Sequence, residues 1–329
     1  MPTARAVTIT EPGDPEVLAI SDVEVRKPGA FEVLVEVAAA GLNRADLLQR
    51  RGLYPAPAGA PKHIPGLEYA GVVAAVGEGV EHVRQGDSVM GIAGGGAMAT
   101  HLVAHERELL RAPARIGLAE AAAIPEAFIT AFDALTLQAE MGLGDVVLIH
   151  AAGSGVGTAA IQLCRRAGAR PIGTSRTAGK LERCRALGLD HGVVVEGGAF
   201  ADEVARLAGS RKPDIVLDAV GAAYLAENLR ALAPKGTIVV IGLMGGVKGE
   251  LPLGALLGKR ARLVGTVLRS RPLEEKASVT QAFGRAALAG FEDGELEPVI
   301  DEVMPMTAIR EAHARMERNE TFGKLVMRW

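Results

Sequence analysis

Alternation of apolar and polar positions dominates the first part of the chain. Between residues 4 and 40, apolar segments such as RAVTI, VLAISDVEV and VLVEVAAA alternate with the turn-forming segments EPGDPE and KPGAFE. Short runs bounded by Gly and Pro are typical of β-strands joined by tight turns. The next stretch, through GVVAAVGEGV and GDSVMGI, keeps this character. The pattern therefore predicts a compact, mostly β lobe.

The spacing of apolar residues changes near Leu118, where the Ala-rich segment GLAEAAAIPEAFITAFDAL predicts helices. An apolar run, VVLIH, then precedes the turn AAGSGVG, a helical segment and a second apolar run, an order that predicts a βαβ unit. The runs PDIVLDAVG and GTIVVIGLMGG flank a further helical segment. Strands that alternate with helices predict an α/β fold with a doubly wound parallel sheet over residues 123–264.

The last part of the chain departs from this alternation. A helical pattern near residues 274–289 is followed by a strand pattern near 298–303 and by the final segment KLVMRW. We expect these pieces to return to the first lobe. The doubly wound domain would then be an insertion between residues 1–122 and residues 265–329.

The turn AAGSGVG is a variant of a dinucleotide-binding loop. In the register of the pattern GxGxxG that ends on Gly157, Ala152 and Ser154 occupy the first two glycine positions. The order of strand, turn and helix still suits a pyrophosphate, which binds the free N–H groups of a helix N-terminus. We therefore expect Ser154, Gly155, Val156 and Gly157 to contact the pyrophosphate. An ordinary Gly-rich turn is the alternative.

The end of the second strand of this domain bears on the choice of coenzyme. The residues there are Thr174, Ser175 and Arg176, and the carboxylate that would bind the ribose hydroxyls of NAD is missing. The guanidinium of Arg176 could bind a 2′-phosphate, with Ser175 and Lys180 adding a hydroxyl and a charge. This pattern favours NADPH over NADH. The alternative is that Arg176 and Lys180 are solvated charges on a surface helix.

Composition narrows the range of partners. The 329 residues are enough for two domains, and the formal net charge of −3 provides no global basic field for nucleic acid or an anionic membrane. No run approaches the ~20 apolar residues that span a bilayer, and the first residues lack a signal-peptide pattern. We expect a cytoplasmic protein whose partner is a small molecule.

The cysteines and histidines predict neither a disulfide framework nor a metal cage. Cys164 and Cys184 are the two cysteines, and both lie in segments with a helical pattern. His101 and His105 are four residues apart, but in a segment with a strand and loop pattern rather than a helical one, so we do not expect them to form a metal site. His150 precedes the phosphate-binding turn, and we expect it to be buried and hydrogen-bonded.

The segments LNRADLLQRRGLYPAPAG, AAAIPEAFITAF, GLMGG and VLRSR add a family resemblance. With the motifs above they resemble the quinone oxidoreductase branch of the medium-chain dehydrogenase/reductases over essentially the whole chain, and within it the p53-inducible quinone oxidoreductase homologues most. The resemblance implies a GroES-like catalytic domain in residues 1–122 and 265–329, interrupted by a Rossmann domain in residues 123–264. It also implies a homodimer through the sheet edge near residues 263–267.

The same resemblance implies roles for individual residues. Asn43 and Thr130 would line the nicotinamide side of the site, Tyr54 would cover the substrate pocket, and Lys324 would lie nearby. Two further segments would pass along the cofactor; their residues are Gly242, Leu243, Met244, Leu268, Arg269 and Ser270. One departure concerns the adenosine end, where relatives of this type carry a Tyr on the strand after Leu189 and this chain has valines at 193–195.

The segments that hold zinc in the related alcohol dehydrogenases differ here. Asn43 and Asp46 replace the ligands of the first motif, and Leu67 precedes Glu68 where a histidine would stand. Catalytic zinc requires Cys and His donors around an open position. We therefore expect no metal and direct hydride transfer from NADPH to an electrophile.

A quinone is the expected electron acceptor, because conjugation delocalises the arriving charge. Asn43 or the hydroxyl of Tyr54 would meet the developing oxyanion, although Tyr54 could equally be an aromatic lid. An enone or alkenal double-bond reductase is the first alternative. A non-catalytic NADPH-binding regulatory protein is the second, and the sequence also leaves open whether the electrons move as one hydride or singly.

Overall fold

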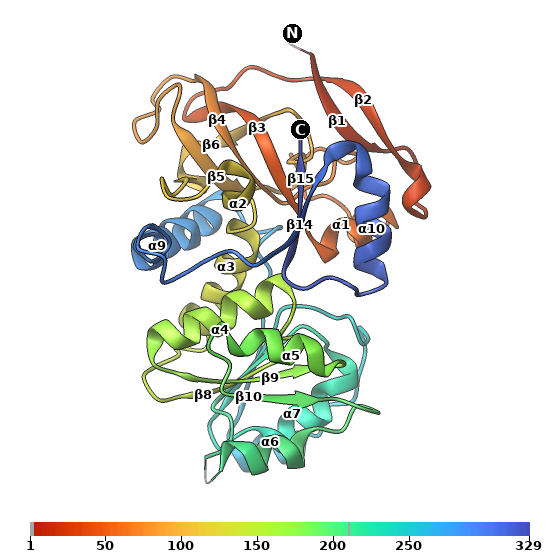
Figure 1. Cartoon of the computed structure of the whole chain (residues 1–329), viewed down its shortest axis with the longest axis vertical. Helices are drawn as coiled ribbons and strands as arrows, with labels where there is room; N and C mark the ends of the chain where they lie inside the picture. Colours follow the sequence, from red (N-terminus) through yellow and green to blue (C-terminus); the bar gives the residue numbers. More distant parts are fainter. Residues whose placement is uncertain (1–2, 210) are drawn as a thin grey trace. The chain divides into compact units, whose positions relative to one another are not determined.

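The computed structural model describes residues 3–209 and 211–329, and the chain divides into two compact units (Figure 1). The first unit comprises Met1–Ile129 and Leu268–Trp329, and the second comprises Thr130–Val267. No helix in the described ranges is long and apolar enough to cross a membrane.

The first unit is built on β-sheet. A two-stranded antiparallel sheet pairs β1 with β2, and a larger sheet runs in the order β14-β15-β3-β4-β5-β7, with β6 paired to β3. The strands are β1 (Thr3–Ile9), β2 (Leu18–Glu24), β3 (Glu32–Leu42), β4 (Glu68–Val76), β5 (Ser88–Ile92), β6 (His101–His105), β7 (Leu109–Arg111), β14 (Ile300–Pro305) and β15 (Lys324–Arg328). The helices are η1 (Pro15–Val17), α1 (Arg44–Arg50), η2 (Glu106–Glu108), α2 (Leu118–Ala121), α3 (Pro125–Phe132), α9 (Leu273–Glu292), η5 (Met306–Ala308) and α10 (Ile309–Glu317). The last residues of α3, from Thr130 on, belong to the second unit.

Strand β3 shows why these residues form a half-buried sheet. Val33, Val35 and Val37 are buried and alternate with the more exposed Leu34 and Glu36, so all three valines point into the core of the first unit. At the other end of β3, Leu42 lies opposite Leu325 of β15, which pairs with β3 antiparallel. This pairing brings the C-terminal Lys324 next to the residues that follow β3.

The second unit contains a six-stranded parallel sheet in the order β10-β9-β8-β11-β12-β13. Its strands are β8 (Val146–Ile149), β9 (Arg170–Ser175), β10 (His191–Val194), β11 (Ile215–Asp218), β12 (Thr237–Val240) and β13 (Arg262–Gly265). Its helices are the π-helical η3 (Asp133–Gln138), α4 (Gly155–Ala167), α5 (Ala178–Arg185), α6 (Ala201–Ala208), η4 (Ala222–Tyr224), α7 (Leu225–Ala231) and α8 (Leu253–Lys259).

This strand order confirms the predicted fold class. Numbered along the chain within the unit, the strands follow the order 3-2-1-4-5-6 that is typical of a dinucleotide-binding sheet. Helices α4 and α5 lie on one face of the sheet and α6 and α7 on the other (Figure 1). All four residues of β8 are buried, as expected for a strand covered on both faces. Cys164 of α4 and Cys184 of α5 are also buried.

Candidate active site

A buried polar cluster surrounds the amino group of Lys324 in the first unit. Its Nζ lies 2.5 Å from Oε1 of Glu68, 2.6 Å from Oδ1 of Asn43 and 2.9 Å from the carbonyl oxygen of Leu42. An ammonium group has three N–H donors, so these contacts use all of them. Lys324 and Glu68 are 5% and 0% exposed, which means that the charges compensate each other away from water.

Asn43 joins this cluster to the start of α1. Its side-chain Nδ2 donates to Glu68 Oε1 at 2.9 Å, and its backbone N–H donates to Asp46 Oδ2 at 2.8 Å. Gly41 leaves the space that Glu68 needs, because a Cβ at that position would come 2.2 Å from Oε1. The amide of Asn43 is therefore held in one orientation from both sides.

Asp46 is fully buried, and backbone N–H groups occupy its carboxylate. Its carboxylate accepts the backbone N–H groups of Asn43 and Gly66, each at 2.8 Å. Burial raises the pKa of Asp46 to about 6, and these two hydrogen bonds together with the charge of Lys324 oppose that rise. The carboxylate thus fixes the backbone at Asn43, just before α1, and at Gly66, just before β4.

Glu126 is an acidic residue of this cluster that the sequence analysis did not single out. Its backbone N–H donates to Glu68 Oε2 at 2.8 Å, which places its partly buried side chain beside the Glu68–Lys324 pair. Burial, followed by the negative charge of Glu68, raises the pKa of Glu126 to about 8. A lone acid within the apolar segment AAAIPEAFITAF was the signal that could have identified it.

Tyr54 is positioned by Arg269. The guanidinium carbon of Arg269 lies 4.9 Å from the centre of the Tyr54 ring, and Nη1 donates to the Tyr54 carbonyl at 3.0 Å. The remaining nitrogens donate to the Gly94 carbonyl at 2.8 Å and to Oε1 of Gln49 at 2.5 Å. Burial raises the pKa of Tyr54, and the charge of Arg269 counteracts this rise. Arg269, expected along the cofactor, is 4% exposed and holds Tyr54 in place.

In the second unit, the turn before α4 forms a cradle for an anion. Ser154 is the N-cap of α4, and its Oγ accepts the N–H of Gly157 at 3.1 Å. The first N–H groups of a helix lack carbonyl partners, and α4 carries no acidic residue in its first turn. A Cβ on Gly157 would lie 2.6 Å from the carbonyl oxygens of Ala151 and Ala152, so only glycine permits this close approach. The cradle therefore fits the diphosphate of a dinucleotide.

The residues expected at the adenosine end come together just beyond β9. Ser175 ends that strand, and its Oγ accepts the N–H of Thr177 at 3.2 Å. Arg176 is exposed, and Lys180 lies partly buried in the first turn of α5. Burial raises the pKa of Tyr224 of η4, and the charge of Arg176 opposes this rise. No acidic residue stands between Thr174 and Lys180.

The other expected contacts are spread over both units. Gly242 and the half-exposed Leu243 and Met244 follow β12 in the second unit, and Thr130 lies in that unit as well, on α3. In the first unit, Leu268 is buried and Ser270 is exposed. Their roles at the cofactor stay predictions.

The predicted burial and hydrogen bonding of His150 are confirmed. Its Nδ1 lies 2.8 Å from Thr174 Oγ1, and its Nε2 lies 2.6 Å from Asn228 Oδ1. Asn228 Nδ2 donates to Asp218 Oδ2 at 2.9 Å, and Asp218 Oδ1 accepts two backbone N–H groups of the turn after β11. Sequence reasoning did not find this chain of contacts, which joins the ends of β9, β8 and β11.

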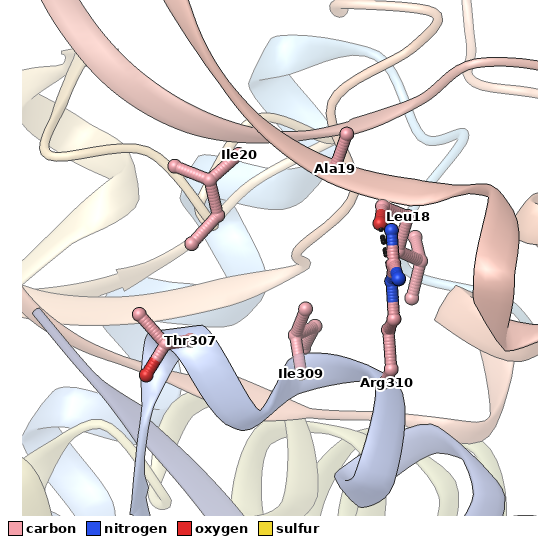
Figure 2. Close-up of a pocket in the computed structure, with 6 residues that line it drawn as sticks. All are labelled: Leu18, Ala19, Ile20, Thr307, Ile309 and Arg310. Carbon is pink, nitrogen blue, oxygen red and sulfur yellow. Dashed lines mark hydrogen bonds between the residues drawn. The ribbon is translucent and has the colours of Figure 1, made fainter.

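A separate cavity of about 280 Å³ lies between β2 and the segment of η5 and α10 (Figure 2). It is lined by Leu18, Ala19, Ile20, Thr307, Ile309 and Arg310. Arg310 Nε donates to the Leu18 carbonyl at 2.8 Å, which ties the helix to the strand. The lining residues belong to none of the clusters above, and we assign no role to this cavity.

Comparison with known proteins agrees with this architecture. Residues 29–114 match the alcohol dehydrogenase GroES-like domain family, and residues 155–284 match the zinc-binding dehydrogenase family. The quinone oxidoreductase of Lama guanicoe is 31% identical over 98% of this chain and 97% of its own length.

Two solved structures are also similar. The CurK enoyl reductase has a TM-score of 0.86 and 29% identity, with 99% of both chains covered. Mycobacterial Rv1454c, solved in complex with NADPH, has a TM-score of 0.86 and 28% identity, with 99% of this chain and all of that chain covered.

The fold and its relatives define a medium-chain dehydrogenase/reductase, an oxidoreductase with a GroES-like domain and a sheet that binds a nicotinamide dinucleotide. Within that class the chain belongs to the quinone oxidoreductase family.

The donor set of this chain does not fit the zinc that one matched family is named for. In the described ranges, no group of three His, Cys, Asp or Glu side chains is arranged to hold a metal ion. The positions that correspond to zinc ligands hold Asn43, Asp46 and the apolar Leu67. Both carboxylate oxygens of Asp46 already accept backbone N–H groups.

Proposed function

We propose that the protein is a zinc-independent, NADPH-dependent oxidoreductase that reduces quinones by direct hydride transfer. The observation that carries the proposal is the cluster of Lys324, Asn43 and Glu68. Asn43 and Glu68 belong to the segments that hold zinc in the related alcohol dehydrogenases. Here their side chains are hydrogen-bonded to each other and to Lys324. Without a metal to polarise a poor acceptor, the acceptor itself must be electrophilic, as a quinone is.

The second unit supports NADPH as the coenzyme. The N-terminus of α4 would bind the diphosphate through Ser154, Gly155, Val156 and Gly157. Arg176, with Ser175 and Lys180, would bind the 2′-phosphate, and no carboxylate nearby would repel it. The NADPH in the mycobacterial relative favours the same choice. When bound, the coenzyme supplies the hydride.

Residues of the first unit would position and stabilise the acceptor. Asn43 has an amide held by Glu68 and Lys324, so it can be a fixed polar contact beside the nicotinamide. The pKa of Tyr54 is raised by burial, so its hydroxyl keeps its proton and can donate a hydrogen bond to the developing oxyanion. Replacing Tyr54 by Phe separates this role from that of an aromatic lid. Turnover falls if the hydroxyl stabilises the oxyanion, and it is unchanged if the ring only covers the pocket.

Reduction of an activated carbon–carbon double bond is the second candidate. The observation that favours it is the similarity to the CurK enoyl reductase over nearly the full length of both chains. Hydride addition to an enone produces the same kind of developing oxyanion, so the same contacts would serve.

The direct test is a spectrophotometric assay of coenzyme oxidation by the purified protein. NADPH and NADH are each compared with naphthoquinones and with short enones. Faster NADPH oxidation with quinones supports the proposal, and faster oxidation with enones supports the second candidate. NADPH binding by calorimetry without turnover on either panel would identify a non-catalytic regulatory protein instead.

We also propose a homodimer through the β13 edge of the parallel sheet. Strand β13 is the last strand of that sheet, and Leu263 on it is 40% exposed. Leu253 and Leu257 on the neighbouring α8 are 62% and 77% exposed. Exposed apolar residues beside an unpaired edge suit pairing with a second copy. Light scattering after size exclusion measures the mass, and a monomer would contradict the proposal.

A further inference from the structure

We propose that Glu126 is the acid that delivers a proton to the reduced acceptor. This inference rests on the proposed function, because a proton is needed only when hydride has reached an electrophile. It adds a catalytic residue to a site in which Asn43 and Tyr54 would otherwise be the groups that contact the substrate.

The position of Glu126 is fixed by its backbone, while its carboxyl group stays unpaired. The N–H of Glu126 is held by Glu68 Oε2 at 2.8 Å, so the first turn of α3 is anchored to β4. Within residues 3–209 and 211–329, no ion pair or hydrogen bond to the Glu126 carboxyl group is found. The side chain is only partly buried, so a small molecule can reach it.

The cations around Glu126 are committed to other partners. Lys324 of β15 uses its three donors on Glu68, Asn43 and Leu42. Arg269, which precedes α9, uses its guanidinium on Gly94, Tyr54 and Gln49. These cations therefore make no hydrogen bond to Glu126, and they lower its pKa only through long-range electrostatic attraction.

The remaining charged neighbours oppose ionisation. Glu68 of β4 and Asp46 of α1 both raise the pKa of Glu126, and burial raises it more than either does. Together these effects raise the pKa of Glu126 to about 8, so the carboxyl group is mostly protonated at neutral pH. An acid is most effective when its pKa lies near the working pH.

Tyr54 and Glu126 have complementary properties. The charge of Glu126 also raises the pKa of the Tyr54 hydroxyl. Burial raises the pKa of Tyr54 above its usual value, so Tyr54 releases a proton less readily than Glu126. Tyr54 would thus hold the oxyanion by a hydrogen bond, and Glu126 would protonate it.

The step balances without another reagent. The two electrons that reduce the quinone arrive with the hydride and leave a hydroquinone monoanion. The O–H bond of Glu126 breaks, its electron pair stays on the carboxylate, and a new O–H bond forms on the hydroquinone oxygen. The carboxylate then regains a proton from water. With an enone, the same proton would go to the enolate.

The kinetic test compares the native protein with Glu126→Gln, in which the side chain keeps its shape and loses its acidic proton. The matched control is Glu275→Gln, the same change at an exposed position of α9. We expect Glu126→Gln to lower kcat by about 100-fold or more and to abolish the fall in kcat of the native protein above about pH 8. NADPH affinity should be unchanged, and Glu126→Asp should recover part of kcat.

Two outcomes separate this inference from the proposed function. An active native protein whose rate and pH profile survive in Glu126→Gln would overturn the role of Glu126 alone. A native protein inactive with every acceptor would overturn the proposed function. In that case infrared difference spectra of native protein minus Glu126→Gln still decide whether Glu126 holds a proton. A protonated-carboxyl band at neutral pH that disappears on alkalinisation supports the inference, and its absence overturns it.

Discussion

Nε2 of His150 lies 2.6 Å from Oδ1 of Asn228, and this contact sets the tautomer of the buried imidazole. The Asp218 carboxylate can only accept, so Asn228 turns its Nδ2 towards it and its Oδ1 towards the ring. His150 must then carry its hydrogen on Nε2. It follows that Nδ1 accepts the hydroxyl hydrogen of Thr174. The direction of each hydrogen bond in the series is thus set by one carboxylate.

Replacing Thr174 by Val tests this assignment, because Val keeps the shape and removes the hydroxyl. His150 Nδ1 would be left buried without a donor, and we expect the free energy of unfolding to fall by about 1–3 kcal/mol. Urea titration at neutral pH measures it. Thr307→Val, at an exposed residue, is the control and should change stability little. Equal stability of the Thr174 variant and the native protein would contradict the assignment.

His313 should make the protein sensitive to acid. Its Nδ1 lies 3.1 Å from Nη1 of Arg50, and burial followed by the charge of Arg50 lowers its pKa from 6.5 to about 3. A histidine whose pKa is lower in the folded state stabilises the protein above pH 6.5. That stabilisation is lost as the pH falls towards about 3, by up to ~1.4 kcal/mol per pH unit.

The free energy of unfolding is measured for the native protein and for His313→Asn at several pH values between 6.5 and about 3. Asn can still accept from Arg50 but does not titrate, so the variant should lose less stability on acidification. His63→Asn, at an exposed residue, should follow the native curve. A His313 variant with the native pH dependence would show that His313 is not responsible.

Arg176→Ala should weaken NADPH binding much more than NADH binding. In the proposed site the guanidinium would pair only with the 2′-phosphate, which NADH lacks, so we expect a loss of about 10- to 100-fold for NADPH alone. Calorimetry with each reduced coenzyme gives both dissociation constants. Arg166→Ala, at an exposed residue of α4, controls for the loss of one positive charge. Equal losses for both coenzymes would remove the assignment.

Gly41→Ala should break the cluster around Lys324. The new Cβ would lie 2.2 Å from Glu68 Oε1, so the carboxylate must leave its place between Lys324 and Asn43. We expect a loss of about 1–3 kcal/mol in unfolding free energy, together with lower turnover. Gly254→Ala is the control, because a Cβ there meets open space. Native turnover in the Gly41 variant would mean that the cluster does not support catalysis.

Local patterns were sufficient for strand β3 and for the strand, turn and helix around Ser154. The alternation in residues 32–42 predicted a half-buried strand, and the run before Ser154 predicted the strand that leads into the cradle. Both follow from the period of apolar residues and from the order of strand, turn and helix. The departure from the glycine pattern did not hide the turn that leads into α4, because Ser154 is small and Gly157 is retained; binding of a phosphate there stays a prediction.

Contacts between distant residues could not be predicted in this way. Lys324 and Asn43 are 281 positions apart, and they meet because β15 pairs with β3. Nothing near Glu126 in the sequence indicates that Glu68 lies beside it and raises its pKa. The family resemblance named Arg269 but not its partners, Gln49 and the Gly94 carbonyl, since these depend on how loops pack.

The burial of both cysteines has a consequence for the proposed reduction of electrophiles. Quinones and enones arylate or alkylate thiolates, and only the deprotonated sulfur reacts readily. Burial raises the pKa of Cys164 far above its usual value and that of Cys184 to about 11, so each thiol keeps its hydrogen. At both cysteines, a reductase of the proposed specificity would be shielded from covalent modification by its own acceptors.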